Sequence, residues 1–112
     1  QALAVVQPDL SIAGGVTEGK KICDHANIYD ATVQLHVCGG PVCTAASLHL
    51  EAAIPNFIIH EHHPTALNEL VIELCVHNYQ PENGRITIPD IPGIGQELND
   101  KVVKDYLAHT VQ

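Results

Sequence analysis

Residues 32–61 read TVQLHVCGGPVCTAASLHLEAAIPNFIIHE and alternate between a strand, a helix and a second strand. Thr32 to Leu35 is β-branched and apolar, which is typical of a strand. Pro41 suits the first position of a helix, and the Ala-rich stretch Val42 to Ala53 predicts the rest of that helix. Asn56 to His60 holds three apolar residues in succession and predicts another short strand.

The residues before this stretch show the same alternation. Leu3 to Pro8 predicts a buried strand, and Glu18 to Tyr29 carries apolar residues at helical spacing. Thr17 is the predicted N-cap of that helix, with Glu18 in its first turn. Strands that alternate with helices indicate an α/β fold with a parallel sheet. Apolar runs without a polar face suit strands that are covered on both sides.

The second half of the chain is more polar. Pro64 to Glu73 predicts a short helix, and residues 82–85 (ENGR) form a turn signal before a small predicted strand at residues 86–88. Pro89 to Gly95 holds two Pro and two Gly and predicts a loop. A last amphipathic helix, capped by Asn99 or Asp100, would place apolar side chains at Val102, Val103, Tyr106 and Leu107.

Composition narrows the class of protein. The chain has 112 residues, enough for one small domain, and its net charge of −8 argues against partners such as nucleic acid or an anionic membrane. There is no apolar run of about 18 residues and no basic segment typical of a signal peptide. We therefore expect a cytoplasmic protein with four reduced cysteines. Because the chain contains no Met, we also expect it to be processed or truncated.

Each of the three predicted strands is followed at once by an ionisable residue, namely Asp9, His36 and Glu61. The carboxyl ends of parallel strands meet on one face of the sheet, where active sites of such folds lie. An Asp beside a His can orient the imidazole for proton transfer, and a second carboxylate would complete a polar cluster. Each residue taken alone also fits a plain role, as a turn residue, a partly buried His or a solvated Glu.

The order of several short motifs resembles the galactonate dehydratase-like members of the mandelate racemase group in the enolase superfamily. The motifs are residues 7–9 (QPD), 13–18 (AGGVTE), His36 with 40–42 (GPV), 46–50 (ASLHL), 54–57 (IPNF) and Glu61. Residues 79–81, 83–84 and 89–95 resemble the C-terminal return segment of that family. Residues 60–63 (HEHH) are similar to the starvation-sensing or mannonate dehydratase-like subgroup.

The resemblance implies the last three βα units, strands six to eight, of a (β/α)₇β barrel of the TIM type, incomplete in this chain. Residues 1–63 would form those units, and residues 64–112 would be a return segment that packs toward an absent capping domain. A three-stranded parallel sheet has two open edges, which a closed barrel removes. The missing N-terminal part of the same enzyme is therefore an expected partner.

The resemblance also implies chemistry. Asp9 and His36 match the family's catalytic dyad, and Glu61 matches a residue that hydrogen-bonds the enediolate oxygen. The implied function is a dehydratase of an acid-sugar substrate, with magnesium as the cofactor of the full-length family. The carboxylates that hold magnesium in that family precede this segment. We therefore expect no metal bound by this chain alone, and an inactive fragment.

The histidine cluster leaves other readings open. His60 and His62 would point to one side of a strand and could bind zinc or nickel, which makes a metal-binding module the alternative of a different class. His62 and His63 are also candidate substrate-binding residues. A third reading is a non-catalytic remnant that self-associates, because an open sheet exposes apolar surface that a homo-oligomer would cover.

Overall fold

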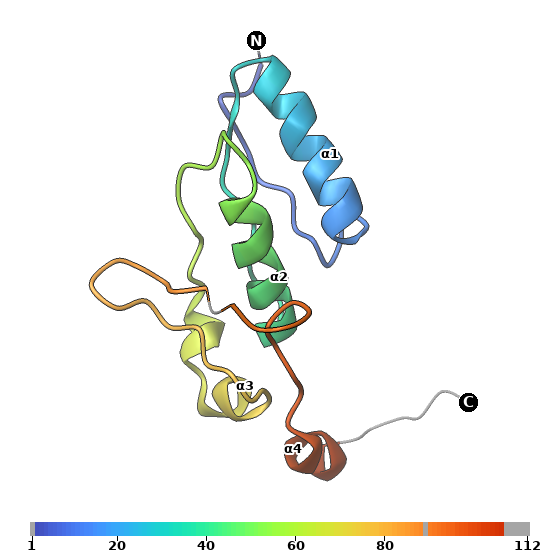
Figure 1. Cartoon of the computed structure of the whole chain (residues 1–112), viewed down its shortest axis with the longest axis vertical. Coiled ribbons are helices and arrows are strands. Elements are labelled where there is room, and N and C mark those ends of the chain that lie inside the picture. Colours follow the sequence, from blue (N-terminus) through green and yellow to red (C-terminus); the bar gives the residue numbers. More distant parts are fainter. Residues whose placement is uncertain (1, 89, 107–112) are drawn as a thin grey trace.

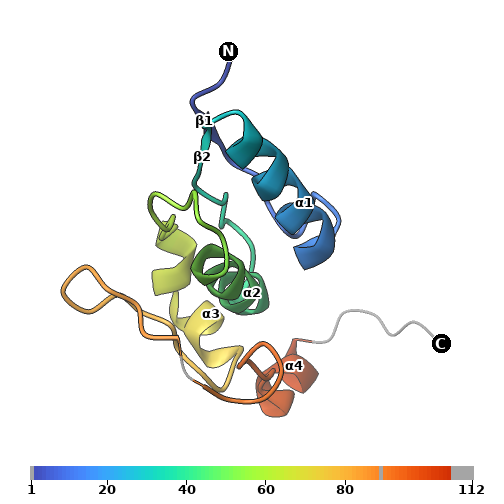
Figure 2. The same cartoon turned by 45° about the horizontal axis from the view of Figure 1, so that its top comes forward.

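The computed structural model describes residues 2–88 and 90–106, in which the helices α1 and α2 lie side by side (Figure 1) and a small parallel sheet lies beside α1 (Figure 2). The elements, in chain order, are β1 (Val5–Val6), α1 (Gly15–Ile28), β2 (Thr32–Val33), α2 (Pro41–Ala52), the 3₁₀ helix η1 (Pro64–Leu67), α3 (Glu69–Glu73) and α4 (Asp100–Asp105). The predicted helices all form, including the short one within residues 64–73. The fold is the α/β class that the alternation predicted.

The sheet is parallel. Val5 pairs with Thr32 and Val6 with Val33, so β1 and β2 run in the same direction. The predicted third strand is wrong in extent, because it is reduced to one parallel bridge between Val33 and Phe57. The backbone N–H of Val33 donates to the oxygen of residue 56 at 2.8 Å, and the N–H of residue 58 donates back to Val33 at 3.0 Å. The side chains of Ile58 and Ile59, which follow the bridge, are exposed.

The main core lies where α1 and α2 pack together against the sheet. The two helices lie side by side in both views (Figures 1 and 2), and α1 also contacts β2. Val33 and Leu35 are completely buried between them, together with Cys23. The remaining members of this core are Leu10, Ala26, Ala31, Val37, Leu50 and Ile54. Val33, Leu35 and Val37 stand at alternate positions and are buried, whereas the residues between them are only half-buried and Val5 of β1 is exposed. The expectation of strands covered on both faces is therefore wrong for the described residues, where one face of β2 is buried.

Helix α1 begins earlier than predicted. Its N-cap is Gly14 and not Thr17, and Thr17 lies inside the first turn of the helix. Gly14 and Gly15 have φ angles of 102° and 84°, a conformation that a side chain disfavours. The N–H of Gly15 donates to the oxygen of Leu10 at 3.0 Å, so the glycine turn itself satisfies a backbone group at the helix start.

Helix α2 carries a second, smaller core on its other side. Its N1 position is Pro41, as predicted. Ala45 and Leu48 of the helix contact the buried ring of Tyr79, and the partly buried Ile86 and Ile88 pack against this cluster. The described part of the return segment therefore folds back onto α2 (Figure 2).

The predicted turn at residues 82–85 is confirmed. Glu82 and Arg85 pair as an antiparallel bridge, and Asn83 and Gly84 between them have φ angles of 52° and 75°. The predicted strand at residues 86–88 is wrong. Beyond Arg85 the two arms of the turn stop pairing, because the side chains of this segment turn toward the Tyr79 cluster.

Helix α4 is capped by Asn99, whose side chain accepts a hydrogen bond from the N–H of Lys101. The amide of Asn99 also donates to the oxygen of Glu73 at 3.0 Å, which ties the end of the described chain to α3. Leu107, expected on the apolar side of α4, and Pro89, expected in the loop, lie outside the described residues. No helix within residues 2–88 and 90–106 is long and apolar enough to cross a membrane.

Candidate active site

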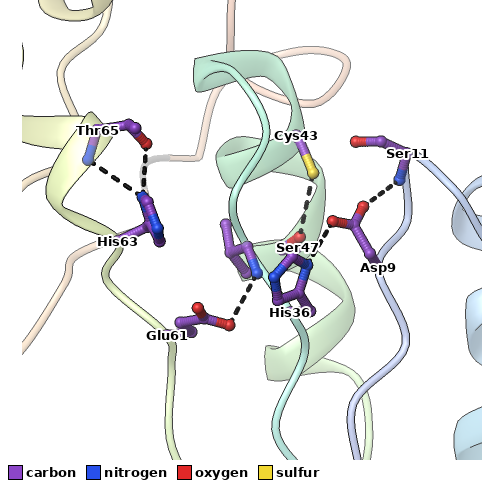
Figure 3. Close-up of polar contacts among 9 residues, drawn as sticks. Asp9, Ser11, His36, Cys43, Ser47, Glu61, His63 and Thr65 are labelled. Atoms are coloured by element: carbon purple, nitrogen blue, oxygen red, sulfur yellow. Dashed lines mark hydrogen bonds and ion pairs between the residues drawn. The ribbon is translucent and has the colours of Figure 1, made fainter.

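Asp9 and His36 meet at the edge of the sheet where β1 and β2 end, which we call the rim. The Nδ1–H of His36 donates to Oδ2 of Asp9 at 2.7 Å (Figure 3). The pairing that begins between β1 and β2 continues to this point, since the backbone N–H of His36 donates to the oxygen of Pro8 at 3.2 Å. Parallel pairing therefore brings together two residues that lie far apart in the sequence.

The two members of this pair have different surroundings. The side chain of Asp9 is 9% exposed, whereas that of His36 is 45% exposed. The N–H of Ser11 donates to the second carboxylate oxygen of Asp9 at 2.7 Å. Burial would raise the pKa of Asp9, but the hydrogen bonds from His36 and Ser11 outweigh it and lower the pKa below its ordinary value. Asp9 is thus a fixed carboxylate behind an imidazole that faces the surface.

Glu61 lies at the same rim. Its Oε2 accepts a hydrogen bond from the backbone N–H of Val37 at 3.1 Å, next in the chain to His36 (Figure 3). Val37 is buried and so gives the carboxylate a fixed partner. The structure therefore brings Asp9, His36 and Glu61 together, although their catalytic roles stay predictions.

The two candidate substrate-binding histidines are placed differently. The ring of His63 caps η1, because its Nδ1 accepts from the N–H of Thr65 at 3.2 Å. The Nε2–H of His62 donates to the side-chain oxygen of Gln80 at 3.0 Å, and its Nδ1 is buried. Neither contact reaches Asp9, His36 or Glu61. A substrate contact by His62 or His63 stays a prediction.

Helix α2 supplies further groups beside the rim that the sequence did not single out. Cys43 and Ser47 lie next to the dyad in Figure 3, with 4.0 Å between Sγ and Oγ. A Cβ at Gly39 would lie 2.8 Å from Cβ of Cys43 and 3.0 Å from Oγ of Ser11. The loop after His36 therefore passes closely between α2 and the turn that holds Asp9, and Gly39 is the residue that allows it.

Glu51 and His60 form a second carboxylate–imidazole pair, which is also absent from the sequence prediction. Oε2 of Glu51 accepts from Nδ1–H of His60 at 2.7 Å, and both side chains are nearly buried, at 4% and 12% exposure. The sequence carried no signal for this contact, because Glu51 lies on a helix at a position that apolar spacing does not mark.

The described residues do not form a magnesium site by themselves. In residues 2–88 and 90–106 no group of three or more His, Cys, Asp or Glu side chains is arranged to hold a metal ion. At the rim, the carboxylates of Asp9 and Glu61 are both engaged by hydrogen-bond donors of the protein. The same finding gives the zinc or nickel module no set of ligands in the described part of the chain.

Known proteins resemble this chain in sequence and in fold. The family model for the enolase C-terminal domain-like proteins matches residues 1–102. A D-xylonate dehydratase from Haloferax volcanii is 36% identical over 107 residues, which cover 96% of this chain and 26% of the relative. A structure of a candidate dehydratase from Salmonella enterica serovar Typhimurium has 68% identity and a TM-score of 0.93, over 97% of this chain and 27% of that one.

A more distant structure contains bound ligands. It is an enolase from Pantoea ananatis with bound D-gluconate and magnesium, with 26% identity and a TM-score of 0.82, over 91% of this chain and 25% of that one. The chain thus spans about a quarter of the length of the proteins that it matches. By its sequence and its fold, this chain belongs to the enolase C-terminal domain-like family, in its mandelate racemase branch.

Proposed function

We propose that this chain is the C-terminal part of an acid-sugar dehydratase, in which Asp9, His36 and Glu61 line one side of the active site. The observation that carries the proposal is the 2.7 Å contact between His36 and Asp9 at a rim that also holds Glu61. Relatives that are sugar-acid dehydratases support the substrate class.

His36 is the proton-transfer group of the proposal. Because Nδ1–H is bound to Asp9, the other ring nitrogen, Nε2, is the one that meets a substrate. Dehydration passes the proton α to a carboxylate to a base, and an acid then gives a proton to the β-hydroxyl, which leaves as water. An imidazole suits this proton transfer near neutral pH, and Asp9 keeps its tautomer and orientation fixed.

Glu61 is the group that stabilises charge. Removal of the α-proton places negative charge on the carboxylate oxygens of the substrate as an enediolate forms. A protonated Glu61 would donate a hydrogen bond to that oxygen. The hydrogen bond from the N–H of Val37 holds the carboxyl group of Glu61 next to the residue that follows His36 in the chain. His62 and His63 are the candidate residues for a further substrate contact, and Figure 3 shows His63 on the same segment as Glu61.

The rest of the active site belongs to residues beyond this chain. Since the described side chains do not assemble a magnesium site, we infer that any such ion is held by the part of the full-length enzyme that this chain does not include. We likewise propose that residues 64–112 pack toward a capping domain, and that this chain alone is inactive. Four free thiols fit an enzyme of the cytoplasm.

The test uses the full-length protein and a panel of acid sugars that includes D-xylonate, D-galactonate and D-gluconate. Formation of the 2-keto acid product is measured for the wild type and for His36→Ala. We expect a fall in kcat of at least about 10²-fold, the contribution typical of a general acid or base. His25→Ala, in an exposed position of α1, is the matched control and should keep wild-type turnover. Unchanged turnover of His36→Ala refutes the dyad.

Self-association is a second candidate, favoured by an open apolar face between β1 and α1. The face forms an open hollow of about 880 Å³ that is lined mainly by apolar side chains, among them Leu3, Val6 and Ile22. Leu3 is exposed, and Ile22 is only partly covered. Apolar surface of this kind is normally buried against another protein surface. Sedimentation velocity of the isolated chain should show oligomers, and a compact monomer at dilution would contradict this candidate.

A further inference from the structure

The segment that carries Glu61 is anchored on both sides of that residue. His60, just before it, donates through Nδ1–H to Oε2 of Glu51 on α2 at 2.7 Å. His62, just after it, donates through Nε2–H to Oε1 of Gln80 at 3.0 Å. The amide of Gln80 in turn donates to the oxygen of Ala66 at 2.8 Å. Two histidine contacts therefore flank the candidate catalytic carboxylate.

The two anchors lie on the side of the segment opposite to Glu61. In an extended chain, side chains at alternate positions point the same way. The rings of His60 and His62 lie 6.4 Å apart, as expected for such neighbours, while the carboxylate of Glu61 reaches Val37 at the rim. Fixing the first two side chains therefore fixes the direction of the third.

The Glu51–His60 contact leaves buried polar atoms without partners, an arrangement that generally disfavours folding and so points to a purpose beyond stability. Oε1 of Glu51 and Nε2 of His60 are both buried without a hydrogen-bond partner among the described residues. A buried pair of this kind is often replaced by apolar side chains with no loss of stability, or with a gain. Glu51 and His60 line a second hollow, separate from the one between β1 and α1, together with apolar neighbours such as Leu48 and Ile59.

We propose that Glu51 is a positioning residue that acts through His60 to hold the carboxyl group of Glu61 at the rim. The proposal rests on the dehydratase function proposed above. Glu51 touches no substrate, because its side chain is 4% exposed and bound to His60. Instead, it fixes the position of Glu61, which contacts the substrate in the proposed function. Residues that hydrogen-bond a metal ligand or a catalytic side chain orient that group in the same way.

The experiment compares two substitutions in the full-length protein. Glu51→Leu removes the acceptor, and we expect kcat to fall by about 10- to 100-fold with KM nearly unchanged. Glu51→Gln keeps an oxygen that can accept from Nδ1–H of His60, and we expect it to restore most of kcat. A purely structural role predicts a different result, in which the melting temperature changes while kcat of the folded protein does not.

A control and a second variant keep the test decisive. Leu50→Ala, next along α2, disturbs the main core without touching His60 and should lower the melting temperature but not kcat. If Glu51→Leu does not fold, the double variant with His60→Leu supplies an apolar pair in its place. That double variant should be folded and still have lost kcat, and wild-type kcat in it overturns the proposal.

The outcomes separate this inference from the proposed function. If the wild-type protein dehydrates no acid sugar, or if His36→Ala is fully active, the dehydratase proposal itself fails. If the wild type is active, His36→Ala is inactive and Glu51→Leu retains wild-type kcat, the function stands and the positioning role of Glu51 is refuted.

Discussion

Asn56 bridges the interior of α1 and the residue before β2, and replacing it with Asp tests whether that contact stabilises the domain. The amide of Asn56 donates to the oxygens of Cys23 and Ala31 at 3.1 and 2.9 Å. Asn56→Asp removes both donors and turns a carboxylate toward two carbonyl oxygens. The two lost hydrogen bonds cost about 2 kcal/mol together, and repulsion adds to this, so we expect about 2–4 kcal/mol of destabilisation.

The assay is urea unfolding of the full-length protein, followed by circular dichroism. Asn56→Ala loses the same two bonds without the added charge, so its loss should be close to about 2 kcal/mol and smaller than that of Asn56→Asp. Asn27→Asp, at an exposed position of α1, is the matched control and should stay within about 0.5 kcal/mol of the wild type. If Asn56→Asp is as stable as the wild type, or if Asn56→Ala is less stable than Asn56→Asp, the role given to this amide is refuted.

Three further experiments test the contact between α1 and Leu10, the reactivity of the cysteines, and the contribution of Asp9 to stability. Gly19→Ala should lower stability by about 1–3 kcal/mol in thermal unfolding, because its Cβ would overlap Cδ2 of the buried Leu10; a higher melting temperature would contradict this. In labelling with a thiol reagent, the exposed Cys38 should react first and Cys23 last, because burial raises the pKa of Cys23 and hides it. Since the pKa of Asp9 is lowered in the folded state, its stabilising effect should be present above about pH 4 and lost as the pH falls further. Urea unfolding midpoints measured from about pH 3 to 7 should therefore fall at low pH in the wild type and fall less in Asp9→Asn.

Local sequence signals predicted the helices better than the strands. Pro41 and an Ala-rich run fixed the place of α2 to within a residue, because both act through the backbone of the helix itself. The start of α1 was missed, since Gly14 and Gly15 form a turn that binds the oxygen of Leu10 and leaves no capping side chain to recognise. The strand at residues 86–88 was overestimated, because its apolar side chains pack on Tyr79 and not on a neighbouring strand.

Some residues of the candidate site could likewise be predicted from the sequence, and others could not. Asp9, His36 and Glu61 could be chosen from the sequence because each directly follows a predicted strand, and parallel strands end at one edge. Glu51 could not be chosen, because its partner His60 becomes its neighbour only after α2 and the following segment fold together. Positions set by sheet topology are therefore open to prediction, whereas contacts between a helix and a loop depend on packing.

Exposure, more than distance, separates the two carboxylate–imidazole pairs of this chain. His36 with Asp9 and His60 with Glu51 both meet at 2.7 Å. In the first pair the imidazole is 45% exposed and the carboxylate 9%, so a substrate can reach the ring while the acid behind it stays fixed. In the second pair both partners are nearly enclosed, at 12% and 4%, so the same contact can hold the chain in place but cannot exchange a proton with a ligand at the rim. We therefore expect one chemical motif to serve two purposes, because the first pair lies at the edge of the sheet and is open to solvent, whereas the second pair is enclosed beside α2.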